Sequence, residues 1–457
     1  MNREPGSSRA ENPERNVLLI TADSIRADYC GFIEGTYDTT PRLDGIAERS
    51  YTFHDAIAPG PRTPSSVPVI LSGRHAATVP DEEGFGPRYD RIATHVRRFG
   101  SVADDLKRRG YTTAAFTANP WTTSATGFDR SFDEFRVIGS THTGAGRGGV
   151  EKEGGLPEGN GLLPGPLGGL LNFAGQWAKK TDWFAQWPTI YRDVLEYIET
   201  AEEPWFLWVF LLDTHSPYIV PREYREEITA PAMYYSALRY NLSVLQQSAD
   251  DTGDTLPNHL DRYLKRSYRD SIRSIDRFVG ALDERTDADR TALVFHSDHG
   301  EAFNEHGTYS HQPRLYEENV RVPLLVQSGE QHQREVRRPV SLARLRDIVG
   351  SLASGERFDP ERFTADHVVS QTEFRDSVAV RGERWKYIAD EDGESLFDLR
   401  TDPHELGDRR NERGDILREM RARHGRFECR RSERRRISAT ISDVIGEAVV
   451  PERSVSD

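Results

Sequence analysis

The stretch that decides the fold runs from Thr291 to Val326, TALVFHSDHGEAFNEHGTYSHQPRLYEENVRVPLLV. It opens with a short apolar run, Ala292 to Phe295, which is typical of a buried strand in a parallel sheet. Directly after this run the chain presents Asp298, His299 and Glu301. In open α/β sheets, ligands bind beyond the carboxyl ends of the strands. A carboxylate and an imidazole at such a position predict a site for a divalent cation.

The density of histidines supports a site over the alternative interpretation, a polar loop with exposed side chains. Four of the 14 histidines fall between positions 296 and 311, and Asp298 and Glu301 lie among them. A loop without a function does not require this concentration of ligating groups.

Two other predicted strands end in side chains of the same kinds. The apolar run Asn16 to Ala22 is followed by Asp23, and the run Trp205 to Leu212 by Asp-Thr-His215. A doubly wound sheet would bring these ends to the same edge as Asp298. Taken alone, Asp23 would also suit a helix N-cap.

A third segment carries hydroxyl groups where a loop becomes a helix. Thr63, Ser65 and Ser66 follow the proline-rich loop that begins at Ala58. A helix N-terminus offers free N–H groups and a positive dipole end, which suit both an anion and a hydroxyl nucleophile. The alternative is simple N-capping by one of these hydroxyls.

Composition limits the class of protein. The chain has 457 residues, a formal net charge of −14 and two cysteines, so we expect neither a nucleic-acid surface nor a disulfide framework. The polar residues 1–16 contain no apolar signal core. The run Trp205 to Leu212 is too short to cross a bilayer. We therefore expect a cytoplasmic protein without a transmembrane segment.

Changes in composition along the chain predict its domains. We expect a disordered N-terminus at 1–14, a catalytic domain at 15–350, a C-terminal subdomain at 351–426 and a mobile tail at 427–457. Within the catalytic domain, the glycine-rich residues 138–170 predict a surface insertion that could cover the site.

Helix and strand signals fill these domains. Helices are predicted from Thr39, across 171–200, across 260–284 and near 414–425. Short strands within 377–388 and from Glu394 predict a small antiparallel sheet in the C-terminal subdomain.

In their order and spacing, several motifs resemble the sulfatase family of the alkaline phosphatase superfamily. The resemblance extends from about position 16 to about 426. It implies an α/β fold with a mixed, mostly parallel sheet flanked by helices, and a small C-terminal antiparallel sheet subdomain. The motifs are NVLLITADSIRAD (16–28), TTPRLD (39–44), TPSSVPVILSGR (63–74), GFDRSFD (127–133), DTHSPY (213–218), SDHGEAFNEHG (297–307) and SLFDLRTDPHEL (395–406).

The nucleophile segment departs from the family pattern. Typical sulfatases carry Cys-x-Pro-Ser-Arg, whose cysteine becomes formylglycine. Aligning Pro64-Ser65 with Pro-Ser puts the unreactive Arg62 at the nucleophile position. Aligning Ser72-Gly73-Arg74 with the following Thr-Gly-Arg puts Thr63 there, as in phosphoglycerol transferases, and this second register is preferred.

The metal-binding residues also differ from those of typical sulfatases. Ser24 stands where the family has a second aspartate, and His299 replaces the common asparagine. The resemblance therefore implies one divalent ion held by Asp23, Thr63, Asp298 and His299. This set favours manganese or zinc over magnesium or calcium, because calcium prefers oxygen ligands.

Histidines complete the expected site. His215 and His311 are predicted to stabilise the equatorial oxygens of the ester or to protonate the leaving alcohol. Glu301 and His306 are expected to shape the loop and to orient His299. Asn119 is a candidate for substrate contact.

The predicted function is metal-dependent hydrolysis of a sulfate or phosphate ester with Thr63 as nucleophile. The expected substrate is an anionic ester of a small molecule, or one derived from a lipid or glycan. Phosphate is favoured chemically, since a threonyl ester cannot collapse to an aldehyde as formylglycine hydrate does.

Two alternatives stay open. One is a phosphoglycerol-type transferase. The other is a degenerate anion-binding relative, which is suggested by Ser24 in place of an aspartate and by Val67 in place of the arginine of the sulfatase motif. The sequence leaves the oligomeric state open.

Overall fold

The computed structural model describes residues 14–75, 85–138, 187–247, 256–330, 333–373 and 377–448. The predicted disordered segment up to residue 13 and the predicted insertion from residue 139 lie outside the described residues.

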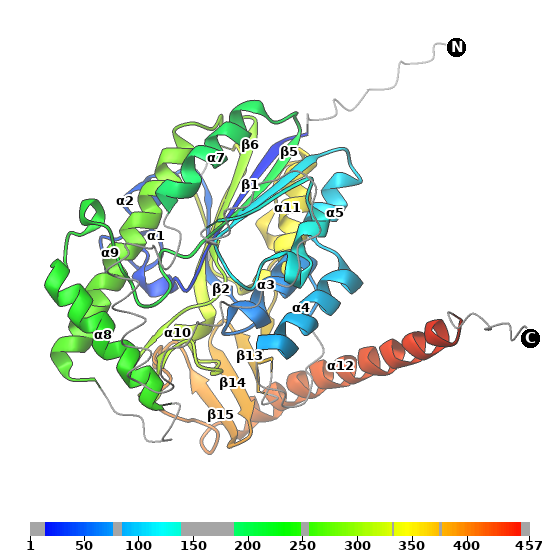
Figure 1. Cartoon of the computed structure of the whole chain (residues 1–457). Coiled ribbons are helices and arrows are strands. Elements are labelled where there is room, and N and C mark those ends of the chain that lie inside the picture. The colour runs from blue at the N-terminus through cyan, green and yellow to red at the C-terminus, as the bar shows by residue number, and fades with distance from the viewer. Residues whose placement is uncertain are drawn as a thin grey trace, which may run out of the picture.

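A nine-stranded sheet forms the centre of the molecule, with the order β10-β2-β9-β6-β1-β5-β3-β4 and with β11 paired to β2 (Figure 1). Strand β9 runs antiparallel to both of its neighbours, and the other pairings in this sheet are parallel. The mixed, mostly parallel sheet is therefore confirmed. The strands are β1 (Asn16–Ala22), β2 (Tyr51–Ile57), β3 (Thr112–Thr117), β4 (Glu134–Val137), β5 (Trp205–Leu211), β6 (Thr291–Ser297), β9 (Arg321–Gln327), β10 (Arg334–Val336) and β11 (Val340–Ser341).

Helices cover both faces of this sheet, which explains why its central strands are almost continuously apolar. Along β1, Val17 and Leu19 pack into one core, whereas Leu18 and Ile20 pack into the other. The first core is closed by α3 (Thr63–Ser72), α4 (Phe85–Phe99), α5 (Val102–Lys107) and α11 (Leu345–Ala353). The second is closed by α2 (Pro41–Ala47), α7 (Trp187–Thr200), α8 (Ala230–Gln247) and α9 (Asn258–Asp283).

Short elements lie between these helices and strands. They are α1 (Gly31–Glu34), β7 (Ala302–Phe303), β8 (Tyr309–Ser310), α10 (Glu317–Val320) and the 3-10 turns at Ala27–Tyr29, Ser124–Thr126, Phe128–Ser131, Arg222–Tyr224, Glu305–Gly307, Leu342–Arg344 and Pro360–Arg362.

A four-stranded antiparallel sheet follows the main sheet, in the order β12-β13-β14-β15. Its strands are β12 (His367–Gln371), β13 (Val378–Gly382), β14 (Trp385–Asp390) and β15 (Gly393–Asp398). This confirms the predicted small C-terminal sheet and adds β12, which the sequence analysis did not identify.

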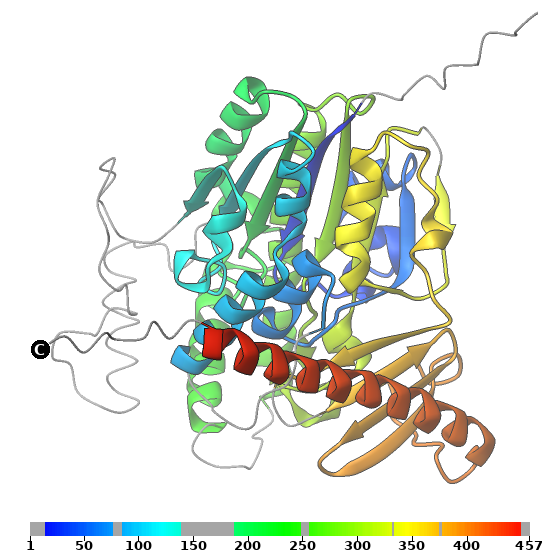
Figure 2. The same cartoon turned by 90° about the vertical axis from the view of Figure 1, so that its right-hand side faces the viewer.

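Helix α12 (Gly414–Ala448) lies along this small sheet, where Leu417 and Met420 contact the apolar side chains of its strands (Figure 2). The helix predicted near 414–425 is thus too short, because α12 continues into the segment predicted as a mobile tail. The sequence from 414 to 448 lacks proline, and ion pairs one turn apart, such as Arg423 with Glu419, support the helix. Among the described residues, the helices are too short or too polar to cross a membrane.

Candidate metal centre and active site

The carboxyl ends of β1 and β6 place two aspartates side by side. The strands pair in register, Ala22 opposite Ser297, so the residues that follow both strands emerge at the same edge. Asp298 donates its backbone N–H to the carbonyl of Ala22 at 3.3 Å, and Asp23 bonds in the same way to Leu211 of β5. Both carboxylates are fully buried. The predicted meeting of Asp23 and Asp298 is present in the structure.

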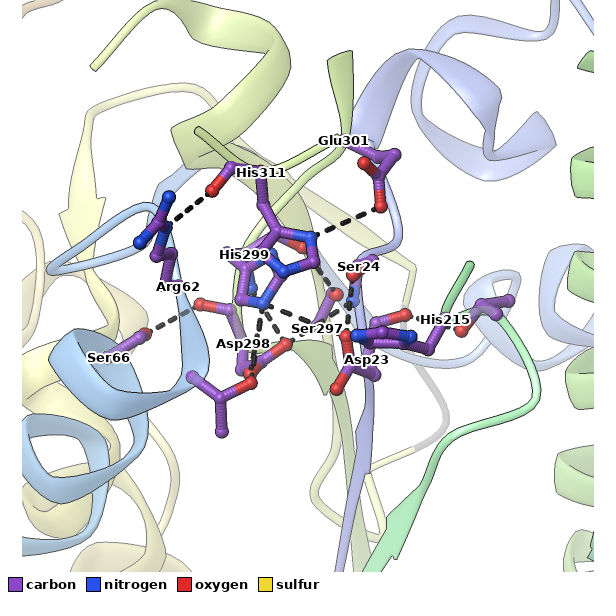
Figure 3. A network of polar contacts seen from close by, with 12 residues as sticks. Asp23, Ser24, Arg62, Ser66, His215, Ser297, Asp298, His299, Glu301 and His311 are labelled. Atoms are coloured by element: carbon purple, nitrogen blue, oxygen red, sulfur yellow. Dashed lines mark hydrogen bonds and ion pairs between the residues drawn. The ribbon is translucent and has the colours of Figure 1, made fainter. Parts of the chain in front are cut away.

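His299 joins these carboxylates to form a three-residue cluster (Figure 3). One ligating atom from each of Asp23, Asp298 and His299 lies within 4.8 Å of the others. His299 Nε2 is 3.7 Å from Asp23 Oδ1 and 3.6 Å from Asp298 Oδ2. These distances leave space between the groups for a shared ion.

The charges in the cluster also fit a cation. Asp298 Oδ2 is buried and has no hydrogen-bond partner among the described residues. Burial and the neighbouring Asp23 raise the pKa of the Asp298 carboxyl well above its usual range. A divalent ion would supply the missing partner and stabilise both carboxylates in their charged form.

The hydrogen bonds of His299 leave its ligating nitrogen available. Its Nδ1 lies 2.8 Å from the carbonyl oxygen of Gly300, which can only accept, so Nδ1 carries the proton. Nε2 then presents a lone pair to the two aspartates. This arrangement is the one that orients a metal-binding imidazole.

Thr63 brings a hydroxyl to the same cluster from the first turn of α3. Its Oγ1 is 3.4 Å from His299 Nε2 and 3.4 Å from Asn119 Nδ2. Arg62, in the extended conformation, precedes the helix, so the chain turns sharply into α3 at this point. The positive end of the helix dipole therefore lies beside the hydroxyl.

The neighbouring serines have structural partners instead. Ser65 Oγ donates to the carbonyl of Arg62 at 2.9 Å, and Ser66 Oγ donates to the carbonyl of Asp298 at 2.6 Å. Of the hydroxyls at the start of α3, that of Thr63 faces the cluster. This geometry favours the register based on Ser72-Gly73-Arg74.

Ser24 takes the position of the missing family aspartate. Its backbone φ is +61°, and its Oγ donates to Asp23 Oδ1 at 2.5 Å. Its backbone N–H donates to Asp298 Oδ1 at 3.3 Å. Ser24 thus holds both carboxylates in place without adding a third negative charge.

Two further histidines border the cluster, as predicted. The ring of His311 lies 4.8 Å from that of His299 and 5.3 Å from that of His215, measured between centroids. His215 Nδ1 lies 2.6 Å from the carbonyl oxygen of Ser216, so its Nε2 is the ring nitrogen that takes no part in this contact. Burial, reinforced by the nearby histidines and Arg62, lowers the pKa of His311 well below its usual value.

Glu301 contacts His311, whereas the sequence analysis expected it to orient His299. Its Oε2 lies 3.5 Å from His311 Nδ1, and the side chain is fully buried. Burial raises the pKa of the Glu301 carboxyl to about 7. The carbonyl of Gly300, not Glu301, orients His299.

Two other polar residues of the strand-end motifs lie outside the cluster. His306 Nδ1 is 2.9 Å from Glu318 Oε1, and its ring stacks on Tyr316 with a centroid separation of 3.6 Å. Asp213 accepts the backbone N–H of Trp187 at 3.2 Å. Both residues fix the backbone around the site.

Asn119 has a larger part in the site than the sequence analysis gave it. Its Nδ2 donates to Asp23 Oδ2 at 2.9 Å and lies 3.4 Å from Thr63 Oγ1. The signal in the sequence is its position shortly after the apolar run that forms β3, as Asp23 follows β1. A neutral amide after a strand is a weaker signal for chemistry than a carboxylate or an imidazole.

Comparison with known proteins matches this sequence to one family. The family model described as Sulfatase matches residues 15–353. The multifunctional alkaline phosphatase superfamily protein PehA of Trinickia caryophylli is 25% identical over 372 residues, covering 70% of this chain and 69% of PehA. Choline-sulfatase of Rhizobium meliloti is 27% identical over 285 residues, covering 52% of this chain and 54% of that protein.

A solved structure supports the same fold. The phosphonate monoester hydrolase of Agrobacterium radiobacter aligns with a TM-score of 0.61 and 17% identity, covering 90% of this chain and 96% of that one. The fold is alkaline-phosphatase-like, and the chain belongs to the sulfatase family. It is a hydrolase acting on ester bonds.

Proposed function

We propose that this protein hydrolyses sulfate or phosphate esters at a single divalent metal ion, with Thr63 as the nucleophile. The observation that carries the proposal is the position of the Thr63 hydroxyl, 3.4 Å from His299 Nε2 in the cluster with Asp23 and Asp298. A nucleophile within reach of a metal ligand set is the arrangement required for metal-assisted ester cleavage.

Asp23, Asp298, His299 and Thr63 would hold the metal. When bound, the ion would lower the pKa of the Thr63 hydroxyl and polarise an oxygen of the ester. One imidazole and two carboxylates suit manganese or zinc better than magnesium or calcium.

The chain's own residues account for the first step. Thr63 Oγ1, after losing its proton to solvent, bonds to the phosphorus or sulfur while the bond to the leaving alcohol oxygen breaks. His215 and His311 contact the equatorial oxygens, and one of them gives a proton to the leaving oxygen. Without substrate, the pKa of His311 is low. An anionic ester beside His311 stabilises the protonated imidazole, so substrate binding raises this pKa.

Water completes the reaction. It attacks the threonyl ester at phosphorus or sulfur, the bond to Thr63 Oγ1 breaks, and the hydroxyl regains a proton. Threonine lacks the second hydroxyl through which formylglycine hydrate expels sulfate. Phosphate mono- or diesters should therefore turn over faster than the matching sulfate.

The alternatives are less well supported. Two of the three named proteins are a sulfatase and a hydrolase, which does not favour a phosphoglycerol-type transferase. A degenerate site would not need the buried, unpaired Asp298 Oδ2 facing His299 and Asp23. Ser24 replaces the missing aspartate with hydrogen bonds to both carboxylates.

A substrate panel tests the proposal. Nitrophenyl phosphate, phosphodiester, phosphonate and sulfate should each be offered to metal-free protein reloaded with manganese, zinc, magnesium or calcium. We expect turnover only with metal, fastest for a phosphate ester with manganese or zinc. Faster hydrolysis of the sulfate with every metal would contradict the preference for phosphate, and activity without metal would contradict the site.

A further inference from the structure

A wall of arginine and aromatic side chains continues outward from the nucleophile. Asn119, which contacts Thr63, accepts the backbone N–H of Trp121 at 2.9 Å. The ring of Trp121 lies 5.2 Å from that of Tyr89 and 6.0 Å from the guanidinium of Arg88, both on α4. An unbroken series of contacts therefore joins Thr63 to α4.

Positive charge accumulates along this wall. Arg88 Nε lies 3.1 Å from Glu373 Oε1, just after β12. Burial raises the pKa of the Glu373 carboxyl. The positive charges of Arg88, Arg62 and Arg91 oppose this rise. Among the residues that the structure describes, Arg88 is thus paired with this carboxylate, and the charges of Arg62 and Arg91 also act on it.

Arg62 ties this charge to the catalytic groups. Its Nε donates to the backbone carbonyl of His311 at 2.7 Å, as Figure 3 shows. The excess of positive charge lies beside the site in a chain whose formal net charge is −14. A local field of this sign attracts anions to the nucleophile rather than to the rest of the surface.

Arg91 has unused hydrogen-bonding capacity. Its Nη1 and Nη2 are buried and have no hydrogen-bond partner within the part of the chain that the structure describes. Buried donors are almost always paired in folded proteins, so two such atoms on one guanidinium require an explanation. Paired N–H groups of this geometry suit an oxyanion, which accepts two parallel hydrogen bonds from arginine.

We propose that Arg91, assisted by Arg88, binds a second anionic group carried by the alcohol part of the substrate. The preferred substrate is then an ester whose alcohol bears a carboxylate, sulfate or phosphate in addition to the group that is cleaved. Trp121 and Tyr89 offer an aromatic surface to the part of the substrate between the two anionic groups. This inference names the substrate class of the proposed active site and rests on the proposed function.

Two esters and matched variants test the inference. The substrates are 4-nitrophenyl phosphate and 3-carboxy-4-nitrophenyl phosphate, which differ by one carboxylate. We expect wild type to prefer the carboxylated ester by about tenfold in kcat/KM, the effect of one charge-assisted hydrogen-bonded contact. Arg91→Gln should abolish this preference, because it should raise KM for the carboxylated ester about tenfold more than KM for the plain ester. Arg91→Lys should restore part of the preference.

Arg97→Gln is the matched control, because it removes the same charge from an exposed part of the same helix, where Arg97 contacts Thr94. It should keep the full preference. Equal loss on both esters in Arg91→Gln, or no preference in wild type, would overturn the inference.

Binding separates this inference from the proposed function. Calorimetry with the same two esters and the Thr63→Ala protein should show about tenfold tighter binding of the carboxylated ester, lost in the double variant with Arg91→Gln. If neither ester is hydrolysed but this difference in affinity is found, the proposed function fails and the anion site stands. Equal affinities would overturn the anion site whatever the activity.

Discussion

Thr63, the proposed nucleophile, lies only two and three residues before the two serines at the start of α3. The Thr63 hydroxyl faces the cluster of Asp23, Asp298 and His299, whereas Ser65 bonds to the carbonyl of Arg62. Thr63→Ala should lower kcat by several orders of magnitude, because it removes the group that forms the covalent ester. Ser65→Ala should reduce kcat by less than about tenfold, since it removes one neutral hydrogen bond. Steady-state kinetics on the best ester of the panel measures both, and an active Thr63→Ala would refute the assignment.

The contact of Glu301 with His311 predicts that Glu301 positions this imidazole. The carboxylate lies 3.5 Å from His311 Nδ1 and is fully buried. Glu301→Gln should lower kcat about 10- to 100-fold, because a neutral amide orients and stabilises the imidazolium less well. KM should change little, and metal content, measured by elemental analysis, should stay at wild-type level.

The control for this variant is Glu305→Gln. Glu305 pairs with Arg26 at 2.8 Å rather than with the histidines of the site. Its kcat should stay near wild type. A similar loss in both variants would indicate general damage to the loop and would argue against a specific role for Glu301.

At the scale of elements, the contact between α3 and α4 depends on a neutral histidine. His95 of α4 is buried, with Nε2 2.8 Å from Ser72 Oγ at the end of α3. Burial lowers the pKa of His95 to about 4. As pH falls below about 6.5, the unfolded chain takes up this proton before the folded one does. Folding stability is therefore lost progressively between pH 6.5 and 4.

The free energy of unfolding in urea should show this dependence. Between pH 6.5 and 4.5, wild type should lose about 2–3 kcal/mol more than His95→Gln, which cannot titrate at this position. Parallel pH dependences for the two proteins would mean that His95 titrates normally in the folded state.

The elements themselves were largely predictable from sequence, because β1, β5 and β6 are apolar runs long enough for one strand and bounded by polar residues. Asp23, Asp298 and His299 could be placed because parallel strands end at a common edge. The prediction ended helix α12 too early. Beyond the part of α12 that packs on the small sheet, the arginine-rich sequence has no apolar periodicity. Strand β12 was missed because it is short and half-apolar, and its pairing with β13 is a tertiary contact.

Finer details of the site depend on tertiary contacts. The ion pair between Arg88 and Glu373 joins α4 to a segment almost 300 residues away, which periodicity cannot reveal. Glu301 directly precedes β7, and its partner His311 directly follows β8. Their contact therefore depends on the pairing of these two strands. Sequence reasoning predicted that Asp23, Asp298 and His299 would lie together, and it missed the contacts that orient the surrounding side chains.

At the scale of the molecule, buried ion pairs attach the small sheet to the catalytic domain. Lys386 of β14 is fully buried, with Nζ 3.0 Å from Glu317 of α10 and 2.9 Å from Glu405. Lys386→Met should destabilise the protein by about 3–5 kcal/mol, because it breaks the ion pair of the buried Glu405 and leaves Glu317 paired with Arg381 alone. Unfolding in urea, followed by tryptophan fluorescence, measures the change.

Lys107→Met is the control for this prediction. Lys107 pairs with Asp133 at 2.8 Å on a partly exposed surface. Its loss should cost no more than about 1 kcal/mol, as is typical of exposed pairs. Equal effects of the two substitutions would mean that the pairs of Lys386 do not join the two sheets.

The central claim is that Thr63 forms a covalent ester with the cleaved group, and mass spectrometry of an acid-quenched reaction tests it most directly. The metal-loaded protein is mixed with the best phosphate ester, quenched during the first turnover and digested. We predict one added phosphoryl group on the peptide that contains Thr63, assigned to that residue by fragmentation and absent in Thr63→Ala. The same group on Ser65, Ser66 or a histidine, or a full first turnover without any adduct, would contradict the account.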